Sequence, residues 1–224
     1  MTDKPTTRLV WDLPTRLFHW LLALSLLASY VTAKIGYDAR QLHLWLGYWM
    51  IGLLAFRIVW GFVGTRHARF LAFFPTPGRV VAYLKRVARG EAKETVGHNP
   101  LGSIMIFMTL ALLSLQAVSG LFVDDEIMFA GPYAMAVSVE FASWMNRIHH
   151  TAINLILVLV GIHIAAVLYH VLVKKEGLIR AMFSGRKSAD VVPEEESIGH
   201  SRLGMAFAVG VVVAGLTYWM TLGA

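Results

Sequence analysis

The sequence predicts an all-α protein that lies in a membrane as a bundle of apolar helices, and three observations lead to this prediction. The 224-residue chain is 57% hydrophobic and only 15% charged, whereas soluble domains carry about 25% charged residues. Its mean hydropathy is +0.60. Five separate segments are apolar over the roughly 20 residues that a helix needs to cross a bilayer core about 30 Å thick.

The five predicted membrane-spanning helices cover residues 14–33, 42–63, 102–123, 147–173 and 203–222. We assign the first four to one domain, residues 1–187, which a polar linker over residues 188–202 joins to the fifth. The first helix has a suitable start, because Asp12 can cap it and Pro14 suits a first turn. A cleaved signal peptide is the alternative for this segment, but such a peptide has no use for His19 inside its apolar run.

Basic residues are distributed unevenly along the chain and predict its orientation. If the N-terminus lies in the cytoplasm, all but three of the 20 lysines and arginines fall at the inner side. The three exceptions are Lys34, Arg40 and Arg147. By the positive-inside rule, this distribution places the C-terminus outside. The sequence pI near 9.7 is then explained by membrane topology, and no nucleic-acid partner is expected.

Two of the segments between the helices have a character of their own. Residues 78–89 combine apolar and basic side chains at helical spacing, which predicts an amphipathic helix on an anionic membrane face. A solvated basic loop is the alternative there. Residues 124–146 form an acidic and aromatic loop, which we interpret as a docking surface for a basic partner. Its acidic residues are Asp124, Asp125, Glu126 and Glu140.

Six of the nine histidines fall in the predicted helices, and four of them lie at two depths. His43 begins the second helix and His149 begins the fourth, both near the outer face, whereas His19 lies near the inner start of the first helix. His149 and His163 are 14 residues apart, a rotation only about 40° short of four turns and a rise of about 21 Å. Both side chains therefore leave one face of the fourth helix, one at each level.

Histidines in this arrangement indicate haem ligation. The chain has no cysteine, which excludes disulfides, iron–sulfur clusters and covalent c-type haem attachment. Two histidines fill both axial positions of a haem iron and suit electron transfer, and the surrounding helices tune the potential. A single histidine in a helix is more often a packed, hydrogen-bonded residue. Four at matched depths predict two haems, although spacing leaves open whether His163 or His170 faces His19.

Further residues near these histidines are candidates for contacts with the haems. Haem propionates favour arginine, and the alternative for each arginine is snorkelling or membrane topology. Gly47, one turn after His43, leaves room for a flat ring, with close helix packing as the alternative. The candidate arginines are Arg16 and Arg57 at the inner level and Arg147 and Arg40 at the outer level.

The remaining histidines are assigned other roles. His150 points about 100° away from His149, and we interpret it as an interface residue near a propionate or a quinone. His67, His98 and His200 fall in loops, where we expect them to be solvated.

Five short motifs carry a family resemblance. They read VWDLPTRLFHW at 10–20, LHLWLGY at 42–48, FRIVWGFVGTRHARF at 56–70, GHNPLG at 97–102 and RIHHTAINLILVLVGIH at 147–163. Together they resemble a bacterial family of membrane b-type cytochromes that includes the cytochrome b subunits of nickel–iron hydrogenases, and superoxide oxidase is similar.

The resemblance covers about residues 8–187 and implies a four-helix core that holds two haems b in the inner (plasma) membrane of a bacterium. Matched position by position, it makes His43 and His149 the ligands of the outer haem. It makes His19 and His163 the ligands of the inner haem, which favours His163 over His170. The fifth helix lies outside this core.

The expected function is electron transfer across the membrane between a redox partner and the quinone pool, with the quinone implied by the resemblance alone. We expect a periplasmic partner, such as a c-type cytochrome, or a dehydrogenase or hydrogenase, and we assign no catalytic residue. One alternative is superoxide oxidase. This activity would need a positively charged entrance for superoxide on the outer face, where we expect only three basic residues. The others are a hydrogenase membrane anchor and a haem-free membrane scaffold.

Overall fold

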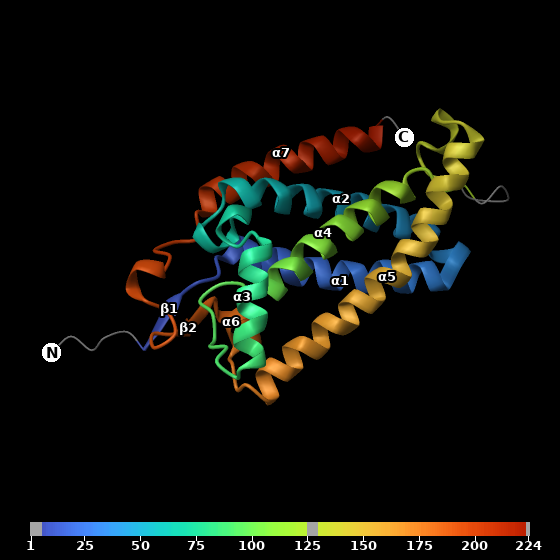
Figure 1. Ribbon diagram of the computed structural model, residues 1–224. Helices are drawn as coiled ribbons and strands as arrows, with labels where there is room; N and C mark the ends of the chain where they lie inside the picture. The colour runs from blue at the N-terminus through green and yellow to red at the C-terminus, as the bar shows by residue number, and fades with distance from the viewer. Residues whose placement is uncertain (1–5, 125–129, 223–224) are drawn as a thin grey trace. The chain divides into compact units, whose positions relative to one another are not determined.

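The computed structural model describes residues 6–124 and 130–222, and these residues are mostly helical (Figure 1). Asp125 and Glu126 of the predicted acidic loop lie outside the described residues. Four helical stretches are long and apolar enough to cross a membrane, and the first is a continuous run of 51 residues. The four candidate spans are Leu13–Val63, Pro100–Gly120, Val139–Leu172 and Leu203–Leu222.

The 51-residue stretch contains two long helices, α1 (Leu13–Ile35) and α2 (Arg40–Val63), joined by the short 3-10 helix η1 (Gly36–Ala39). Gly36 has a φ of +78°, a left-handed conformation that glycine adopts at little cost. The indole Nε1 of Trp49 donates a hydrogen bond to the hydroxyl of Ser25 at 2.9 Å. Since these residues lie on opposite sides of η1, the chain reverses there and the two helices run antiparallel.

The helices α4 (Pro100–Gly120), α5 (Val139–Leu172) and α7 (Leu203–Leu222) form the other candidate spans. The backbone N–H of Gly102 donates to Asn99 Oδ1 at 2.7 Å, so Asn99 caps the start of α4. Our expectation of a loop up to residue 146 is wrong, because α5 begins at Val139. Ser138 caps this earlier start by accepting a hydrogen bond from the N–H of Phe141 at 3.3 Å.

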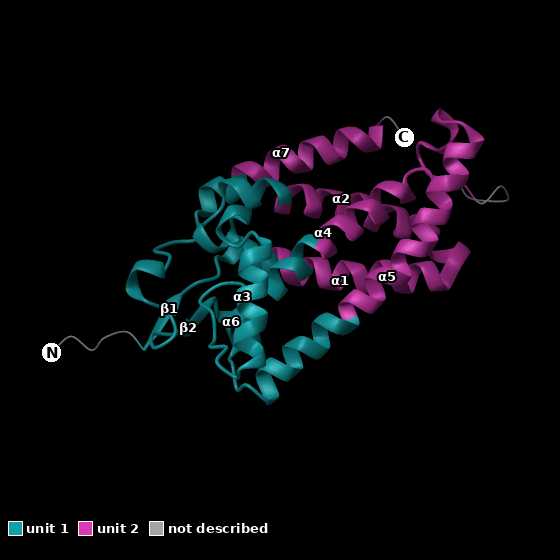
Figure 2. Cartoon of the chain, viewed as in Figure 1, with its two compact units in different colours: residues 1–17, 58–107, 161–207 teal, residues 18–57, 108–160, 208–224 magenta. Residues whose placement is uncertain are grey.

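The chain divides into two compact units, which are coloured separately in Figure 2. Unit 1 comprises residues 1–17, 58–107 and 161–207, and unit 2 comprises residues 18–57, 108–160 and 208–224. Each unit draws on several segments that are distant in the sequence.

Unit 1 contains the helices α3 (Pro77–Ala88) and α6 (Leu178–Ser184) and two short strands. Strand β1 (Thr7–Leu9) pairs antiparallel with β2 (Arg186–Ser188). A small core of four buried hydrophobic residues packs beside the strands, and it consists of Val10, Trp11, Ala181 and Val192. Val192 belongs to the segment that we predicted as a polar linker, and the N–H of Ile198 in the same segment donates to Leu9 O at 2.9 Å.

The carboxylate of Asp12 organises the start of α1 within unit 1. Asp12 is only 1% exposed, and its Oδ1 accepts from the N–H of Thr15 at 2.7 Å and from the indole of Trp60 at 3.2 Å. The hydroxyl of Thr65 donates to the other oxygen, Oδ2. Asp12 is therefore more than a helix cap, because it joins the first residues of α1 to the end of α2.

The expectation that His67 is solvated is wrong. Its side chain is buried in unit 1, and its Nε2 donates to the carbonyl of Glu196 at 2.8 Å. The rings of His67 and Trp11 lie edge to face with their centroids 6.2 Å apart. The segment around Glu196, which is distant in sequence, covers this histidine, so its burial follows from tertiary packing.

In unit 2, helix α7 packs beside α2. A Cβ placed on Gly52 would lie 3.1 Å from the hydroxyl of Thr217, so the glycine allows the two helices to approach closely. The hydroxyl of Tyr133 also donates to the carbonyl of Met220 at 2.8 Å.

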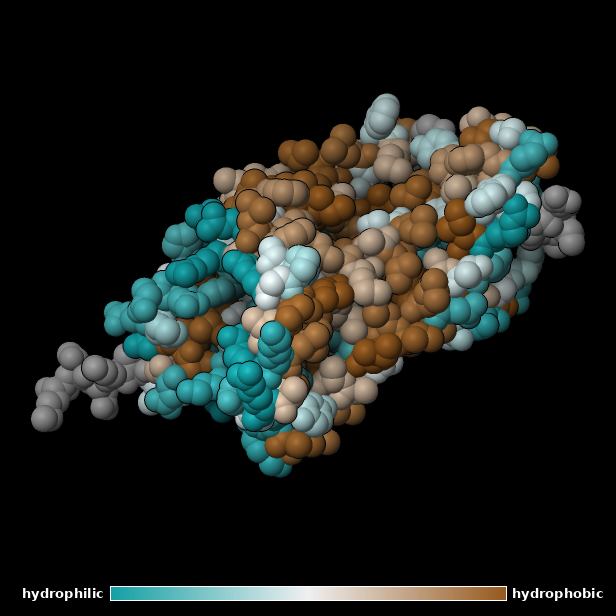
Figure 3. All heavy atoms as spheres, in the orientation of Figure 1, coloured by the Kyte–Doolittle hydropathy of each residue, from teal (hydrophilic) through white to brown (hydrophobic). Residues whose placement is uncertain are grey.

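The apolar side chains of the candidate spans are largely exposed. Within α7, which is described throughout, Val213 is the only buried residue, and Phe207 and Trp219 are 76% and 71% exposed. Figure 3 shows mostly hydrophobic atoms over α7 and α4 on the visible face. Soluble proteins rarely expose contiguous apolar surfaces of this kind, so these faces suit contact with lipid.

Candidate functional site

The structure brings His43 of α2 and His149 of α5 together in unit 2. Their ring centroids are 6.4 Å apart and the ring planes are nearly perpendicular, at 86°. Both side chains are partly buried among helices that are otherwise apolar. Intramembrane histidines are costly and usually functional, so this pair is the candidate site.

Each histidine of the pair is oriented by a backbone carbonyl. The Nδ1 of His43 lies 2.9 Å from Ser29 O on α1, and the Nδ1 of His149 lies 3.0 Å from Gln116 O on α4. A carbonyl oxygen can only accept, so both Nδ1 atoms carry the hydrogen and both Nε2 atoms keep a lone pair. Metal-binding histidines are typically held in this way.

Helices α1, α2, α4 and α5 therefore all contribute to the environment of the pair. On α1, the hydroxyl of Thr32 lies 3.2 Å from His43 Nδ1. On α4, the hydroxyl of Ser119 lies 3.4 Å from His149 Nδ1. Neither Gln116 nor Ser119 was singled out as a site residue from the sequence. In the sequence, each is only a polar residue in an apolar helix, and that pattern does not show which group the side chain will contact.

Gln116 also contacts the ring nitrogen that a metal would use. Its amide nitrogen lies 3.1 Å from His149 Nε2, while its Oε1 is buried without a hydrogen-bond partner among the described residues. Metal ligation by His149 would need this amide to swing away from Nε2. The unpartnered Oε1 means that the amide forgoes only one hydrogen bond when it moves.

The pair fits the axial ligation of a haem. Two imidazoles that bind one metal through nitrogens at about 2 Å place their ring centroids about 6 Å apart, close to the observed 6.4 Å. One turn after His43, a Cβ placed on Gly47 would meet nothing within 4 Å, so there is open space beside α2. The residues present therefore suit a flat group held between two histidines.

Gly120 on α4 makes room for His149. A Cβ at this position would lie 2.9 Å from His149 Cε1 and 3.2 Å from His149 Nδ1. Real Cβ atoms essentially never come closer than 3.0 Å to another heavy atom, so any larger residue here must displace the ring.

We expect Gly120→Ala to lower haem binding at the His43–His149 pair, because the added methyl group pushes His149 from its bond to Gln116 O. The haem-to-protein ratio of the purified variant should fall by up to one haem per chain. Gly210→Ala is the matched control, because a Cβ there meets nothing within 4 Å. Unchanged haem content and unchanged midpoint potentials in Gly120→Ala would contradict the role given to this glycine.

The structure places His19 in unit 2 and His163 in unit 1, and each unit is described by itself. The ring of His19 packs edge to face on that of Trp20, with centroids 4.9 Å apart. His163 has an exposed side chain on α5. The predicted pairing of His19 with His163 stays a prediction.

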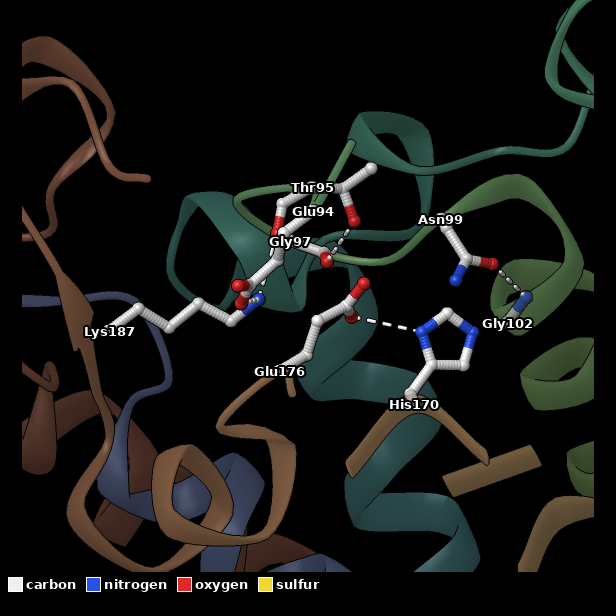
Figure 4. Close-up of polar contacts among 8 residues, drawn as sticks. All are labelled: Glu94, Thr95, Gly97, Asn99, Gly102, His170, Glu176 and Lys187. Carbon is white, nitrogen blue, oxygen red and sulfur yellow. Dashed lines mark hydrogen bonds and ion pairs between the residues drawn. The ribbon is translucent and has the colours of Figure 1, made fainter. Parts of the chain in front are cut away.

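His170, the competing candidate, has a partner of its own. Its Nδ1 lies 2.9 Å from Glu176 Oε2, and Figure 4 shows the two side chains facing each other. Burial, and secondly the charge of Glu176, raise the pKa of Tyr83 on α3. In the same view, the amine of the buried Lys187 lies 3.0 Å from Glu94 Oε1. This part of unit 1 is thus a network of paired polar groups.

The candidate arginines lie in different environments. Arg57 is 3% exposed on α2, an unusual burial for a charged group in an apolar helix. Arg16 donates from its guanidinium to the carbonyl of Phe183 in unit 1. Arg147 lies over the ring of Trp144 at 5.4 Å, and Arg40 lies over that of Tyr37 at 4.6 Å.

Long apolar helices with a histidine pair between them are typical of haem-binding helical membrane proteins. The chain matches the family model described as prokaryotic cytochrome b561 over residues 10–185, and it belongs to this family. It is therefore a multi-pass membrane cytochrome b, a haem-containing electron-transport protein. The predicted family is confirmed.

Curated relatives with the name "probable Ni/Fe-hydrogenase B-type cytochrome subunit" are similar to most of the chain. The relative from Rhizobium leguminosarum bv. viciae is 28% identical over 213 residues, which cover 80% of this chain and 87% of the relative. The relative from Azotobacter chroococcum mcd 1 is 27% identical over 223 residues, which cover 81% and 89%.

Proposed function

We propose that this cytochrome carries electrons across the membrane through two haems b, each held by two histidines. His43 and His149 would hold the outer haem, and His19 and His163 the inner one. The observation that supports this best is the His43–His149 pair, with each Nδ1 bonded to a carbonyl and each Nε2 left with its lone pair. The inner pair rests on the family resemblance.

The chain's own residues would orient and shield the redox centres. When bound, each haem b iron supplies one-electron chemistry by changing between its ferric and ferrous states. Ser29 and Gln116 fix the planes of the two imidazoles through their carbonyls. A haem held by two histidines would carry electrons rather than bind oxygen. Gly47 would leave space for the haem ring. The haem propionates would pair with arginines: Arg16 and Arg57 at the inner level and Arg147 at the outer level.

The proposed topology has five spans, with the N-terminus in the cytoplasm and the C-terminus in the periplasm. In this arrangement, the stretch Leu13–Val63 crosses the membrane twice, because α1 and α2 are 23 and 24 residues long and each exceeds the roughly 20 residues of one span. The reversal at Gly36 and the contact between Ser25 and Trp49 support two crossings. The distribution of lysine and arginine supports the orientation.

For the redox partner, we propose a hydrogenase or a protein like it, with quinone as the acceptor in the membrane. The names of the relatives support this choice, since they are hydrogenase cytochrome subunits by name. A periplasmic c-type cytochrome is the other partner that the sequence suggested.

Haem content and electron transfer test this function together. The purified protein should contain two haems b per chain and show b-type bands in a reduced-minus-oxidised spectrum. In membranes, hydrogen should reduce these bands when the hydrogenase partner is present, and added quinone should reoxidise them. A spectrum without b-type bands would contradict the proposal, and rapid quinone reduction by superoxide would favour superoxide oxidase instead.

The inner ligand is tested by comparing two histidines of α5. We expect His163→Ala to lower the haem content from two per chain to one, because it would remove an axial ligand. His170→Ala should keep both haems, since His170 is bonded to Glu176. Pyridine haemochrome analysis of both variants measures this, and the reverse result would show that His170 is the ligand.

A further inference from the structure

A basic cavity lies in unit 1 where α2 ends and α7 begins. Its volume is about 190 Å³, and its walls come from residues 65–69 and 198–202. Val63 ends α2 and Leu203 begins α7. Both helices belong to candidate membrane spans, and a bilayer around these spans would have its headgroups near the level of the cavity.

The lining of this cavity carries positive charge without a carboxylate. It includes Arg66, Arg69, Arg202 and His200, and no acidic residue. In the part of the chain that the structure describes, none of the three arginines forms a salt bridge, since the recorded ones involve Arg8, His170 and Lys187. Their charges therefore remain available to an anion.

Two of the arginines are fixed in place by backbone carbonyls. The guanidinium of Arg202 donates to Val63 O at 3.2 Å and to Gly64 O at 3.4 Å, and that of Arg66 donates to Glu195 O at 2.7 Å. Arg202 itself has a φ of +50°, a conformation that is costly for a residue other than glycine and that often marks functional sites.

His200 adds a hydrogen-bond donor to the cavity. The N–H of Arg202 donates to His200 Nδ1 at 3.3 Å, so the neutral imidazole carries its hydrogen on Nε2. The arginines supply further N–H groups in the geometry that matches phosphate oxygens.

Apolar side chains surround the ends of the two helices. Phe62 at the end of α2 is 63% exposed, and Leu203 and Phe207 at the start of α7 are 56% and 76% exposed. A ligand with a phosphate and acyl chains would thus meet arginines and apolar side chains in turn.

We propose that this cavity binds a phosphate group, supplied by the headgroup of an anionic phospholipid. Basic pockets beside membrane helices recognise such headgroups by charge and hydrogen bonding. Inorganic phosphate shares this chemistry and is the other possible source of the anion. The proposal is independent of the haems and of the redox partner.

The test uses the purified full-length protein in neutral detergent, with phosphatidylglycerol as the probe and phosphatidylcholine as the zwitterionic comparison. The wild-type protein should bind phosphatidylglycerol more tightly than phosphatidylcholine. Arg69→Gln should weaken that affinity by about five-fold, the effect of one basic residue near an anionic headgroup. Arg69 is the best position to change, because no hydrogen bond of its side chain is recorded in the described residues, so the fold does not depend on it.

Arg89→Gln is the matched control, because it removes the same charge from an exposed position at the end of α3. Sodium phosphate, compared with sodium chloride at equal ionic strength, distinguishes the source of the anion. Competition by phosphate at millimolar concentration would support the cavity and assign it to free phosphate. The proposal would be overturned if the protein bound the two lipids with equal affinity and phosphate did not compete. It would also be overturned if Arg69→Gln and Arg89→Gln lowered the affinity for phosphatidylglycerol equally.

Discussion

Replacing His43 by alanine is expected to lower the haem content from two per chain to one, and replacing His149 should have the same effect. Apart from His150, which is the control below, the polar groups around the pair are serine, threonine and glutamine contacts of α1 and α4, and none of these is an imidazole. Pyridine haemochrome analysis gives the haem count. A potentiometric titration should change from two reduction steps in the wild type to one in either variant.

His150→Ala is the matched control for this prediction. His150 is exposed on the same helix, next to His149 in sequence and with its ring centroid 5.8 Å from that of His149. If haem binding depends on the specific pair, His150→Ala keeps both haems. Two haems in His43→Ala, or an equal loss in His150→Ala, would show that the pair does not ligate haem.

Replacing Asp12 by alanine is expected to destabilise the protein by about 3 kcal/mol, because three donors lose a buried acceptor. Trp60 is fully buried, and Thr65 and Thr15 are 4% and 6% exposed. Water therefore cannot readily replace the carboxylate. A loss of this size lowers Tm by about 10 °C in a protein of this length, which thermal unfolding in detergent would measure.

Two further variants separate the hydrogen-bond network from a simple loss of charge. Asp12→Asn retains an acceptor oxygen for Trp60 and Thr15 and should cost less than the alanine change. Asp190→Ala removes an exposed carboxylate of the same unit, whose recorded side-chain contact is with Ser188, and Tm should barely change. Similar losses of Tm in Asp12→Ala and Asp190→Ala would show that the buried network contributes little.

The motifs behind the family resemblance have two different physical roles. In FRIVWGFVGTRHARF, Trp60 and Thr65 bind Asp12, and a Cβ on Gly61 would come within 2.1 Å of the Phe70 ring. These residues hold unit 1 together. The histidine motifs, in contrast, provide the paired rings of the candidate site. Sequence resemblance identifies both sets together, and only the contacts separate them.

The sequence alone determined the class of fold, because hydropathy and charge are properties of local composition. Residues 203–222 were predicted as a helix from their apolar run, and α7 has these bounds. The 14-residue spacing of the histidines and their depth in the helices likewise follow from helix geometry. The prediction began the fourth helix at residue 147 and missed the start of α5, because residues 139–146 are not apolar enough to indicate a membrane span.

Only the tertiary structure decided which polar groups meet. It gave the rings of His43 and His149 a carbonyl partner each and set Gly120 against His149. It also buried His67, whose neighbours in sequence suggested a solvated loop. The physical reason is that helical period fixes the face from which a side chain leaves, whereas its partner depends on how distant segments pack.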